Sequence, residues 1–224
     1  MKIVISIGGS ILTKELSYDH FLRYANAIKE LAKKHDIAII CGGGKPAREF
    51  RDIAKNADRD KRDFIGIMAT HLNASALASV MGKDAHLIRW KPLKEALKEL
   101  KKMFGRRIVV GGGYDVGTST DYDAVIFAKT VKADLIVNAT NIDGVYSDDP
   151  RKNPKARKFD SLSYQKFLKI IGRLKQTPGE YRLFDLKGAM LLKAIKVKLI
   201  IVDGSNPHEI IDAVNGYHNG TTIE

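Results

Sequence analysis

The chain has 224 residues, of which 44% are apolar, and 38 Lys and Arg against 26 Asp and Glu give it a net charge of +12. This length suits one sizeable α/β domain or two tightly joined lobes, and Cys41, the only cysteine, excludes an intrachain disulfide and a cysteine-rich zinc site. The charge favours an anionic partner, which leaves nucleic acid, an acidic membrane or a phosphorylated small molecule.

Nothing in the sequence predicts a membrane segment. The N-terminal stretch MKIVISIGGS meets glycines after seven residues, which is too short for the apolar part of a secretory signal. No later stretch approaches the roughly 20 apolar residues of a membrane span. With a single cysteine, the chain is expected to be a soluble, cytoplasmic protein with no membrane partner.

Apolar runs of strand length alternate along the chain with longer segments of helical periodicity. The first run, KIVISI at 2–7, is rich in β-branched residues, and in the next segment, 17–36, apolar residues share one helical face behind Ser17, a suitable N-cap. Further strands are predicted at 37–41, near 86–89, and at 107–111, 134–138 and 198–202. Further helices are predicted from about Lys45, from about Asp63 to Met81, at 91–107, at about 121–132, and from about Ser161, Asp185 and Pro207.

This alternation predicts an α/β fold, a three-layer αβα sandwich whose central, mostly parallel sheet is covered by helices on both faces. The polar stretch 172–182 is predicted to be a loop. In the segment 91–107, lysines alternate with glutamates beside a leucine stripe, which is typical of a solvated amphipathic helix. A nucleic-acid surface would combine clustered cations with exposed aromatics, so no nucleic-acid partner is expected.

Three of the predicted strands end in glycines. They continue into GGS at 8–10, GGGK at 42–45 and GGGYDVGTSTD at 111–121. In an open parallel sheet, ligands bind outside the carboxyl ends of the strands, and glycines there let backbone N–H groups approach an anion. One glycine pair fits a tight turn equally well, but three at one edge favour a shared polyanion site.

The GGGK sequence is not a P-loop. That motif needs four residues between its glycines and a hydroxyl residue after the lysine, whereas Pro46 follows Lys45 here. The dinucleotide fingerprint G-x-G-x-x-G is absent as well, because GGGKPA lacks the third glycine. The glycines therefore serve a different phosphate site.

The stretch NATNIDGVYSDDPRKNP at 138–154 would on its own fit a turn-rich hairpin. Together with the glycine junctions and their order, it resembles the amino acid kinase superfamily over nearly the whole chain. Within that superfamily the chain is similar to the short archaeal uridylate kinases. The motifs that carry this resemblance are IGGS, GGGKPAR, DFIGI at 63–67, GGYDVGTSTD, NATNIDGVYSDDP and HNGTTI at 218–223.

The resemblance implies a kinase that transfers the γ-phosphoryl group of ATP to UMP, giving UDP and ADP, with Mg²⁺ as cofactor. It implies one amino acid kinase domain over 1–224, with an N-terminal acceptor lobe at about 1–128 and a C-terminal ATP lobe at about 129–224. Relatives commonly form hexamers, so a homo-oligomer is expected.

The resemblance also implies site residues, carried over position by position. Residues expected to contact ATP are Gly9, Ser10, Gly43, Arg48, Thr140, Tyr146 and Asp149. Those expected to contact UMP are Gly42, Asp63, Gly113, Gly117, Thr118, Ser119 and Thr120. Lys45, Arg48 and Asp121 are the candidate catalytic residues, and no protein metal site is expected.

Three of these side chains have alternative interpretations. Arg48 can reach phosphates as a bidentate donor or can be a solvated helix arginine. Asp63 can accept from two ribose hydroxyls or can cap the helix that follows it. Asp121 resembles the family aspartate that organises cations around the transferred phosphoryl group, and it can also be a helix cap.

The sequence departs from the family pattern at two places. Many relatives carry a lysine on the first strand just before the glycine pair, where this chain has Ser6. Lys45 is the leading candidate for the missing cation, followed by Lys14 and Lys187. A lysine is also frequent near the position of Met190, so Lys187 is only a possible ATP ligand.

Two other functions remain open. An isopentenyl phosphate kinase has the same fold, but that branch usually has a histidine after its second glycine junction, and GGGKPAR has none. A nucleotide-binding regulator without turnover is compatible with Ser6. Carbamate and acetylglutamate kinases fit less well, because their resemblance fails at DFIGI and YDVGTSTD.

Overall fold

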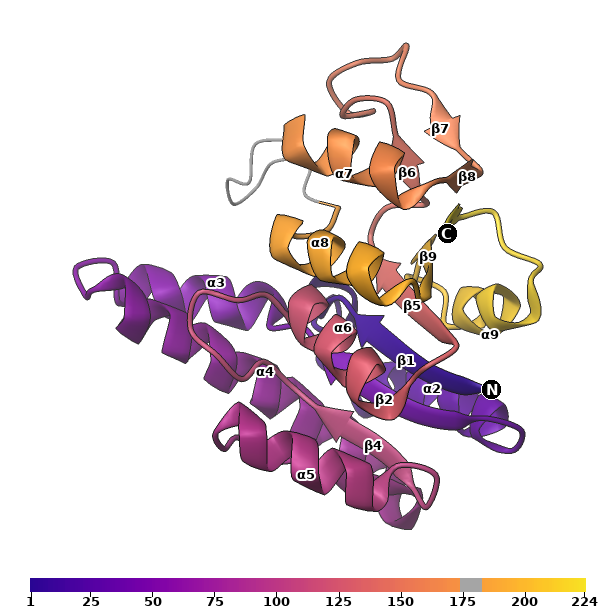
Figure 1. Ribbon diagram of the computed structural model, residues 1–224. Coiled ribbons are helices and arrows are strands. Elements are labelled where there is room, and N and C mark those ends of the chain that lie inside the picture. The colour runs from indigo at the N-terminus through magenta and orange to yellow at the C-terminus, as the bar shows by residue number, and fades with distance from the viewer. Residues whose placement is uncertain (174–182) are drawn as a thin grey trace.

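The computed structural model describes residues 1–173 and 183–224, so most of the loop predicted at 172–182 lies outside the described residues. Figure 1 shows the helices arranged about a twisted central sheet. The strands are β1 Lys2–Ile7, β2 Asp36–Cys41, β3 Ala85–Leu87, β4 Ile108–Gly111, β5 Leu135–Thr140, β6 Val145–Tyr146, β7 Lys158–Phe159, β8 Ser161–Leu162, β9 Lys198–Asp203 and β10 Thr221–Ile223. The helices are α1 Gly9–Leu12, α2 Tyr18–Ala32, α3 Gly44–Ile53, α4 Arg59–Met81, η1 Gly82–Asp84, α5 Leu93–Met103, α6 Thr120–Val131, α7 Tyr164–Arg173, α8 Leu186–Ile195 and α9 His208–Asn215.

The main sheet has the strand order β3-β4-β2-β1-β5-β9-β10-β8. Its first six strands are parallel to one another, while β10 runs antiparallel to β9 and parallel to β8. The strands β1, β2 and β5 are almost wholly buried runs of Ile, Val, Leu and Ala, as expected for a parallel sheet covered on both faces. The predicted mostly parallel sheet is confirmed.

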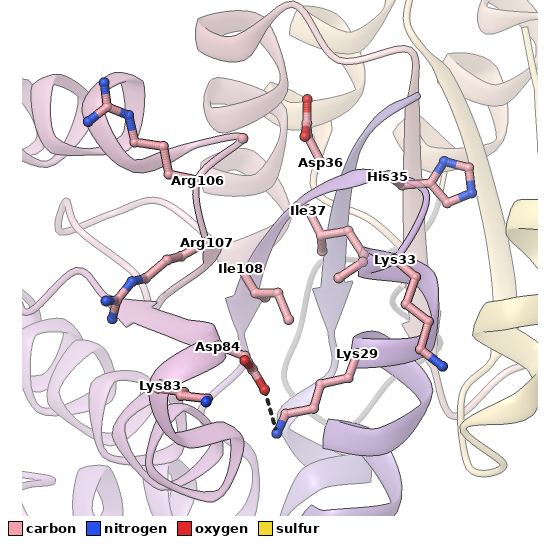
Figure 2. Close-up of a pocket in the computed structure, with 12 residues that line it drawn as sticks. Lys29, Lys33, His35, Asp36, Ile37, Lys83, Asp84, Arg106, Arg107 and Ile108 are labelled. Carbon is pink, nitrogen blue, oxygen red and sulfur yellow. Dashed lines mark ion pairs between the residues drawn. The ribbon is translucent and has the colours of Figure 1, made fainter.

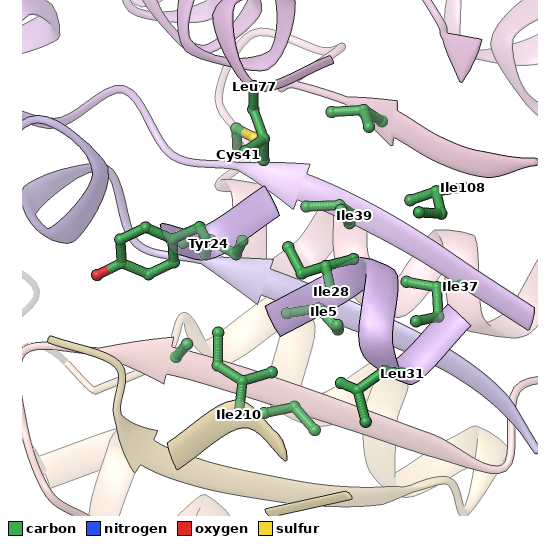
Figure 3. Close-up of a cluster of buried hydrophobic side chains, with 14 of the residues drawn as sticks. Ile5, Tyr24, Ile28, Leu31, Ile37, Ile39, Cys41, Leu77, Ile108 and Ile210 are labelled. Atoms are coloured by element: carbon green, nitrogen blue, oxygen red, sulfur yellow. The ribbon is translucent and has the colours of Figure 1, made fainter. Parts of the chain in front are cut away.

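Alternate residues of each strand enter two separate cores, because side chains in a strand point to opposite faces. Ile3, Ile5 and Ile7 of β1 join one core, which includes the buried residues of α2 and α9. Figure 3 shows part of that core, where Ile28 and Leu31 of α2 lie near the strand residues Ile5, Ile37 and Ile39. On the other face, Val4 and Ile40 pack with buried residues of α5, α6, α7 and α8. These two helical layers around the sheet complete the predicted three-layer sandwich.

Several predicted boundaries are wrong. The helix expected from Asp63 begins at Arg59, because Asp58 caps it by accepting a hydrogen bond from the backbone N–H of Lys61. The helix expected from Ser161 begins at Tyr164, since Ser161 and Leu162 form β8 beside β10. Short strands such as these carry too few residues to show a periodicity.

One helix in the described part of the chain passes a membrane-span test that core helices of soluble proteins also pass. The continuous segment Arg59–Asp84 is long and apolar enough by length and composition alone. Half of its most apolar window is buried inside the fold, as in the core helices of soluble proteins.

Candidate active site

The three glycine junctions lie together at the carboxyl edge of the sheet. Parallel pairing places Ile7 of β1 opposite Cys41 of β2, and Ile40 of β2 opposite Gly111 of β4. The chain therefore leaves three adjacent strands at one level, as the sequence predicted. Each junction then turns into a loop or a helix at this edge.

The first two junctions touch backbone to backbone. A Cβ placed on Gly9 would lie 2.0 Å from the nitrogen of Gly44 and 2.6 Å from the oxygen of Gly42. Gly44 itself has φ +65°, a conformation that favours glycine. Thr13 joins the two junctions, because its hydroxyl donates to the Gly9 oxygen at 2.7 Å and accepts from the Lys45 N–H at 3.1 Å. Glycine is thus required here by packing as well as by turn geometry.

Two further strands end at the same edge. The N–H of Gly8 donates to the oxygen of Ala139, the next-to-last residue of β5, at 2.8 Å. The N–H of Gly204, just after β9, donates to the oxygen of Thr140 at 2.8 Å. Thr140, a predicted ATP residue, consequently lies beside the first glycine junction.

A pocket of about 270 Å³ opens between the second and third junctions and α4. Polar groups from several elements converge in it, which is typical of a ligand site. It collects most of the predicted acceptor residues and one catalytic candidate, together with residues that were not predicted. The predicted residues lining it are Gly43, Asp63, Gly113, Thr118, Ser119, Thr120 and Asp121, and the others include Arg51, Gly66, Thr70 and Asp115.

Asp63 lies inside α4, one turn beyond its start, so the interpretation of Asp63 as a helix cap is wrong. Its carboxylate accepts from the guanidinium of Arg51 at 3.1 Å and from the N–H of Gly117 at 3.2 Å. Arg59 contributes a third, longer contact of 3.8 Å. Asp63 thereby ties the third junction loop to α3 and α4 across the pocket.

Asp121 is held by polar residues from two adjacent strands. Ser6 on β1 and Asn138 on β5 lie opposite each other in the sheet, and both donate to the same carboxylate oxygen of Asp121 at 3.3 Å. Ser6 and Asn138 are buried in the sheet. The cap of α6 is Ser119, whose hydroxyl accepts from the N–H of Tyr122, so Asp121 is not the helix cap. Ser6 thus has a specific role, since it orients this carboxylate.

The N-termini of α6 and α8 meet at the pocket. Asp185 caps α8 by accepting from the N–H of Gly188, and it also accepts from the hydroxyl of Ser119. Lys187, on the first turn of α8, reaches the oxygen of Gly117 at 3.5 Å. These contacts join the loop of the third junction to the C-terminal half of the chain.

The other candidate cations point elsewhere. Lys45 is exposed and pairs with Glu49 at 3.5 Å on the outer face of α3. Arg48 is also exposed on α3, and Lys14 is exposed after α1. In the described part of the chain, the cation that lines the pocket is Arg51, one turn beyond Arg48 on the same helix.

Two predicted ATP residues lie farther along the C-terminal half. Tyr146 belongs to the two-stranded sheet β6–β7, and its hydroxyl donates to Asp143 at 2.9 Å. Asp149 is buried and accepts from the backbone N–H and the guanidinium of Arg151, both at 3.0 Å. The Arg151 guanidinium holds the pKa of Asp149 below its usual range. Asp149 is therefore ionised and fixes the turn after β6.

Comparison with known proteins identifies the fold family. The family model described as "Amino acid kinase family" matches residues 1–203. The chain belongs to the amino acid kinase family. Among its relatives, uridylate kinase of Methanococcoides burtonii is 39% identical over 216 residues, covering 96% of this chain and 91% of that protein. Uridylate kinase of Archaeoglobus fulgidus is 37% identical, and both chains are covered completely.

Solved structures agree with this family. The crystal structure of uridylate kinase from Archaeoglobus fulgidus superposes with a TM-score of 0.88 at 36% identity, covering all of both chains. That of UMP kinase from Ureaplasma parvum gives a TM-score of 0.80 at 22% identity, covering all of this chain and 98% of the other, which supports the fold alone.

A second, larger pocket of about 530 Å³ lies at the opposite edge of the amino acid kinase sheet, where β2 and β4 begin. Figure 2 shows its basic lining and the ion pair of 2.8 Å between Lys29 and Asp84. The helices α2 and α5 end beside it, and cations are favourable at helix C-termini. This lining needs no ligand to explain it, so we place the functional site at the glycine junctions.

Sequence reasoning missed Arg51 and Asn138. Arg51 lies one turn beyond Arg48, and the spacing of three residues on a helix was the available signal. Asn138 interrupts the apolar residues of β5, and a buried amide within a strand signals a polar partner. That partner, Asp121, comes from a helix and cannot be inferred from local spacing.

Proposed function

We propose that this protein is a uridylate kinase, which transfers the γ-phosphoryl group of ATP to UMP and releases UDP and ADP in pyrimidine nucleotide biosynthesis. The observation that carries the proposal is the similarity to archaeal uridylate kinases, at 34 to 39% identity over nearly the whole chain. The pocket between the glycine junctions supports it with fixed backbone donors, one arginine and two held carboxylates.

Phosphoryl transfer needs two nucleotides aligned in line and the charge on the moving group neutralised. We propose that UMP occupies the 270 Å³ pocket, with Asp63 at its ribose hydroxyls and the loop 113–120 around its phosphate. The ATP phosphates would lie over Gly9, Ser10 and Gly43, beside the Thr140 end of β5. The two phosphates then meet above the junctions, which pack against each other without side chains between them.

For the donor nucleoside we propose contacts with Thr140, Tyr146 and Asp149, all in the ATP lobe at about 129–224. The acceptor lobe at about 1–128 supplies the pocket. The proposed division runs between β1 and β5 in the strand order, so both lobes share one sheet. Lys45, Arg48 and Lys187 are proposed sources of positive charge, with Arg51 as a further one.

Mg²⁺ is proposed to enter with ATP. The described residues contain no group of three His, Cys, Asp or Glu side chains that could hold a metal ion by themselves. Mg²⁺ in enzymes of this kind is held largely by substrate phosphates and water. When bound, the ion would neutralise phosphate charge, and the protein would position the nucleotides around it. A cytoplasmic location is proposed because both substrates are intracellular metabolites.

The direct test is release of ADP from ATP with UMP, CMP or isopentenyl phosphate as acceptor. We expect turnover with UMP and much slower turnover with isopentenyl phosphate. Faster turnover with isopentenyl phosphate than with UMP would show that isopentenyl phosphate is the acceptor. If no ADP is released with any of the three acceptors, the protein is a nucleotide-binding regulator and not a kinase.

Replacing Asp63 with asparagine should weaken UMP binding selectively. The change removes the charge that holds Arg51 and Gly117 across the pocket, and hydrogen bonds to charged groups contribute about 1.5 to 3 kcal/mol. We expect KM for UMP to rise about tenfold or more, with KM for ATP within about twofold. Asp52→Asn, on the exposed side of α3, is the control. If KM for UMP and KM for ATP rise equally, Asp63 does not belong to the acceptor site.

We further propose that the protein is a homo-oligomer, with hexamers as the expected assembly. The helices α3 and α4 project from the body at the left of Figure 1, and no residue of α3 is buried. Large apolar side chains remain exposed on these helices, on the segment before α2 and on the first residue of α2. They are Leu16, Tyr18, Phe50, Ile53, Phe64, Met68 and Leu72. Exposed large apolar side chains of this kind are typical of an interface between subunits.

The double substitution Ile53→Lys with Leu72→Lys should break this assembly. The two side chains are 79% and 64% exposed, so the fold loses little, while an interface over them would bury two charges. Sedimentation velocity should show a smaller particle. Tyr217→Lys, equally exposed beyond α9, should leave the particle size unchanged. A wild-type protein that sediments as a monomer would contradict the assembly.

A further inference from the structure

Gly113 and Tyr114 lie two and three residues beyond the end of β4, and side chains form hydrogen bonds with the N–H and the oxygen of both. The Gly113 N–H donates to the Thr70 hydroxyl at 2.7 Å, and the Gly113 oxygen accepts from Nε2 of His71 at 2.8 Å. The Tyr114 N–H donates to Asp123 at 3.4 Å, and the Tyr114 oxygen accepts from the indole of Trp90 at 3.4 Å. A turn after a strand is usually bonded by backbone or water, so four side-chain partners in succession form a dedicated clamp.

The clamp is built from three parts of the fold. Thr70 and His71 are neighbours on α4, Asp123 lies on α6, and Trp90 follows β3. Thr70, His71 and Asp123 are each less than a tenth exposed. Burying polar side chains costs free energy unless they are hydrogen-bonded, and each of these three bonds the turn, while the Thr70 hydroxyl also donates to the Ile67 oxygen at 2.6 Å. The four side chains thus fix the turn against both helices.

The side chain of Tyr114 is fixed as well. Its ring meets His71 edge to face at 5.3 Å between centroids and stacks on Phe127 at 5.7 Å. Space behind the turn is closed, because a Cβ on Gly112 would lie 2.4 Å from the Thr70 hydroxyl. The loop 115–120 starts from this fixed turn and then forms one wall of the pocket.

We propose that Asp123, together with Thr70 and His71, is a positioning residue for acceptor binding: it fixes the direction in which the loop 115–120 leaves the sheet. The inference rests on the proposed function, in which this loop surrounds the phosphate of UMP. None of the three acts on the reacting atoms. Asp123 and His71 act through the backbone that they hold, whereas Thr70 both holds it and lines the pocket, and so loss of any of them should affect the acceptor more than ATP.

The surroundings of the clamp disfavour charge. Burial raises the pKa of Asp123 well above its usual value, and the nearby carboxylates Asp115, Asp185 and Asp121 raise it further. Burial also lowers the pKa of His71. Both shifts favour the neutral forms, in which the carbonyl oxygen of Asp123 can accept from Tyr114, and the Gly113 oxygen requires the proton of His71 to be on Nε2. An asparagine at 123 would present the same neutral acceptor.

This equivalence gives a matched pair of variants. Asp123→Asn keeps the acceptor, whereas Asp123→Leu keeps the approximate size and removes it. We expect Asp123→Leu to raise KM for UMP about tenfold, with KM for ATP and the melting temperature little changed. Asp123→Asn should stay within about twofold of wild type for both substrates. The pair Thr70→Ser and Thr70→Val repeats the comparison at the Gly113 N–H.

Hydrogen–deuterium exchange provides a readout that needs no substrate. The amides of Gly113 and Tyr114 should exchange at least about tenfold faster in Asp123→Leu than in Asp123→Asn, while amides of β1 remain unchanged. If the wild type does not phosphorylate UMP, the proposed function is wrong. The exchange rates of the Gly113 and Tyr114 amides still show whether the clamp fixes the turn. Equal exchange in the two variants, or equal increases in both KM values, would overturn the positioning role. If Asp123→Leu does not fold, the Thr70 pair decides.

Discussion

Gly9→Ala is expected to reduce kcat/KM for UMP phosphorylation by about 100-fold or more. The new methyl carbon would lie 2.0 Å from the nitrogen of Gly44 and 2.5 Å from the carbonyl carbon of Gly42, both backbone atoms that cannot rotate away. The first two junctions would have to separate by about 1 Å. A misplacement of that size can cost about 100-fold when two reacting groups must be aligned.

Steady-state release of ADP gives kcat/KM, and a melting curve shows whether the variant is folded. Overpacking of this kind also costs about 1 to 3 kcal/mol of stability, so a lower melting temperature is expected. Gly172→Ala is the control, because, apart from its own helix backbone and chain neighbours, no atom of the described residues lies within 4 Å of a Cβ built on that glycine of α7. Alanine at position 172 should stabilise α7, because alanine has a higher helix propensity than glycine, and it should leave kcat/KM unchanged. A folded Gly9→Ala enzyme with half of the wild-type kcat/KM would show that the two junctions need not touch.

The glycine junctions were predictable because they depend on local sequence and on one topological rule. Near-continuous Ile and Val runs indicate parallel strands, and parallel strands deliver their carboxyl ends to one edge. The fold class and the meeting of GGS, GGGK and GGGYDVGTSTD followed from that. The contact between Gly9 and Gly44 could not be predicted in this way, because it depends on the distance between the ends of β1 and β2.

Side-chain partners were less predictable, since they come from elements far apart in the chain. Asp63 and Asp121 both precede apolar helical segments, and sequence alone allowed each to be a cap. The caps are Asp58 and Ser119, which begin the helices a few residues earlier and leave both carboxylates on pocket walls. Ser6 was interpreted as a missing lysine, while in the structure its hydroxyl orients Asp121.

Asp121→Asn should lower kcat by about 100-fold or more, with smaller changes in either KM. Ser6 and Asn138 hold one oxygen of this carboxylate from adjacent buried strands, so the group is fixed before substrate binds. A fixed carboxylate here would orient the cations that neutralise the transferred phosphoryl group, and losing one fixed electrostatic contact in an active site typically costs about 100- to 1,000-fold. Because the amide has nearly the same shape, the pocket should keep its affinity for UMP.

Asp60→Asn separates this effect from the loss of a helix charge. Asp60 is the second residue of α4, as Asp121 is of α6, so each asparagine removes the same favourable interaction with a helix N-terminus. That interaction contributes about 0.3 to 1 kcal/mol, so both variants should melt slightly earlier. Only Asp121→Asn should lose turnover. If the two variants retain equal kcat, then Asp121 supports α6 alone and does not organise the cations around the transferred phosphoryl group.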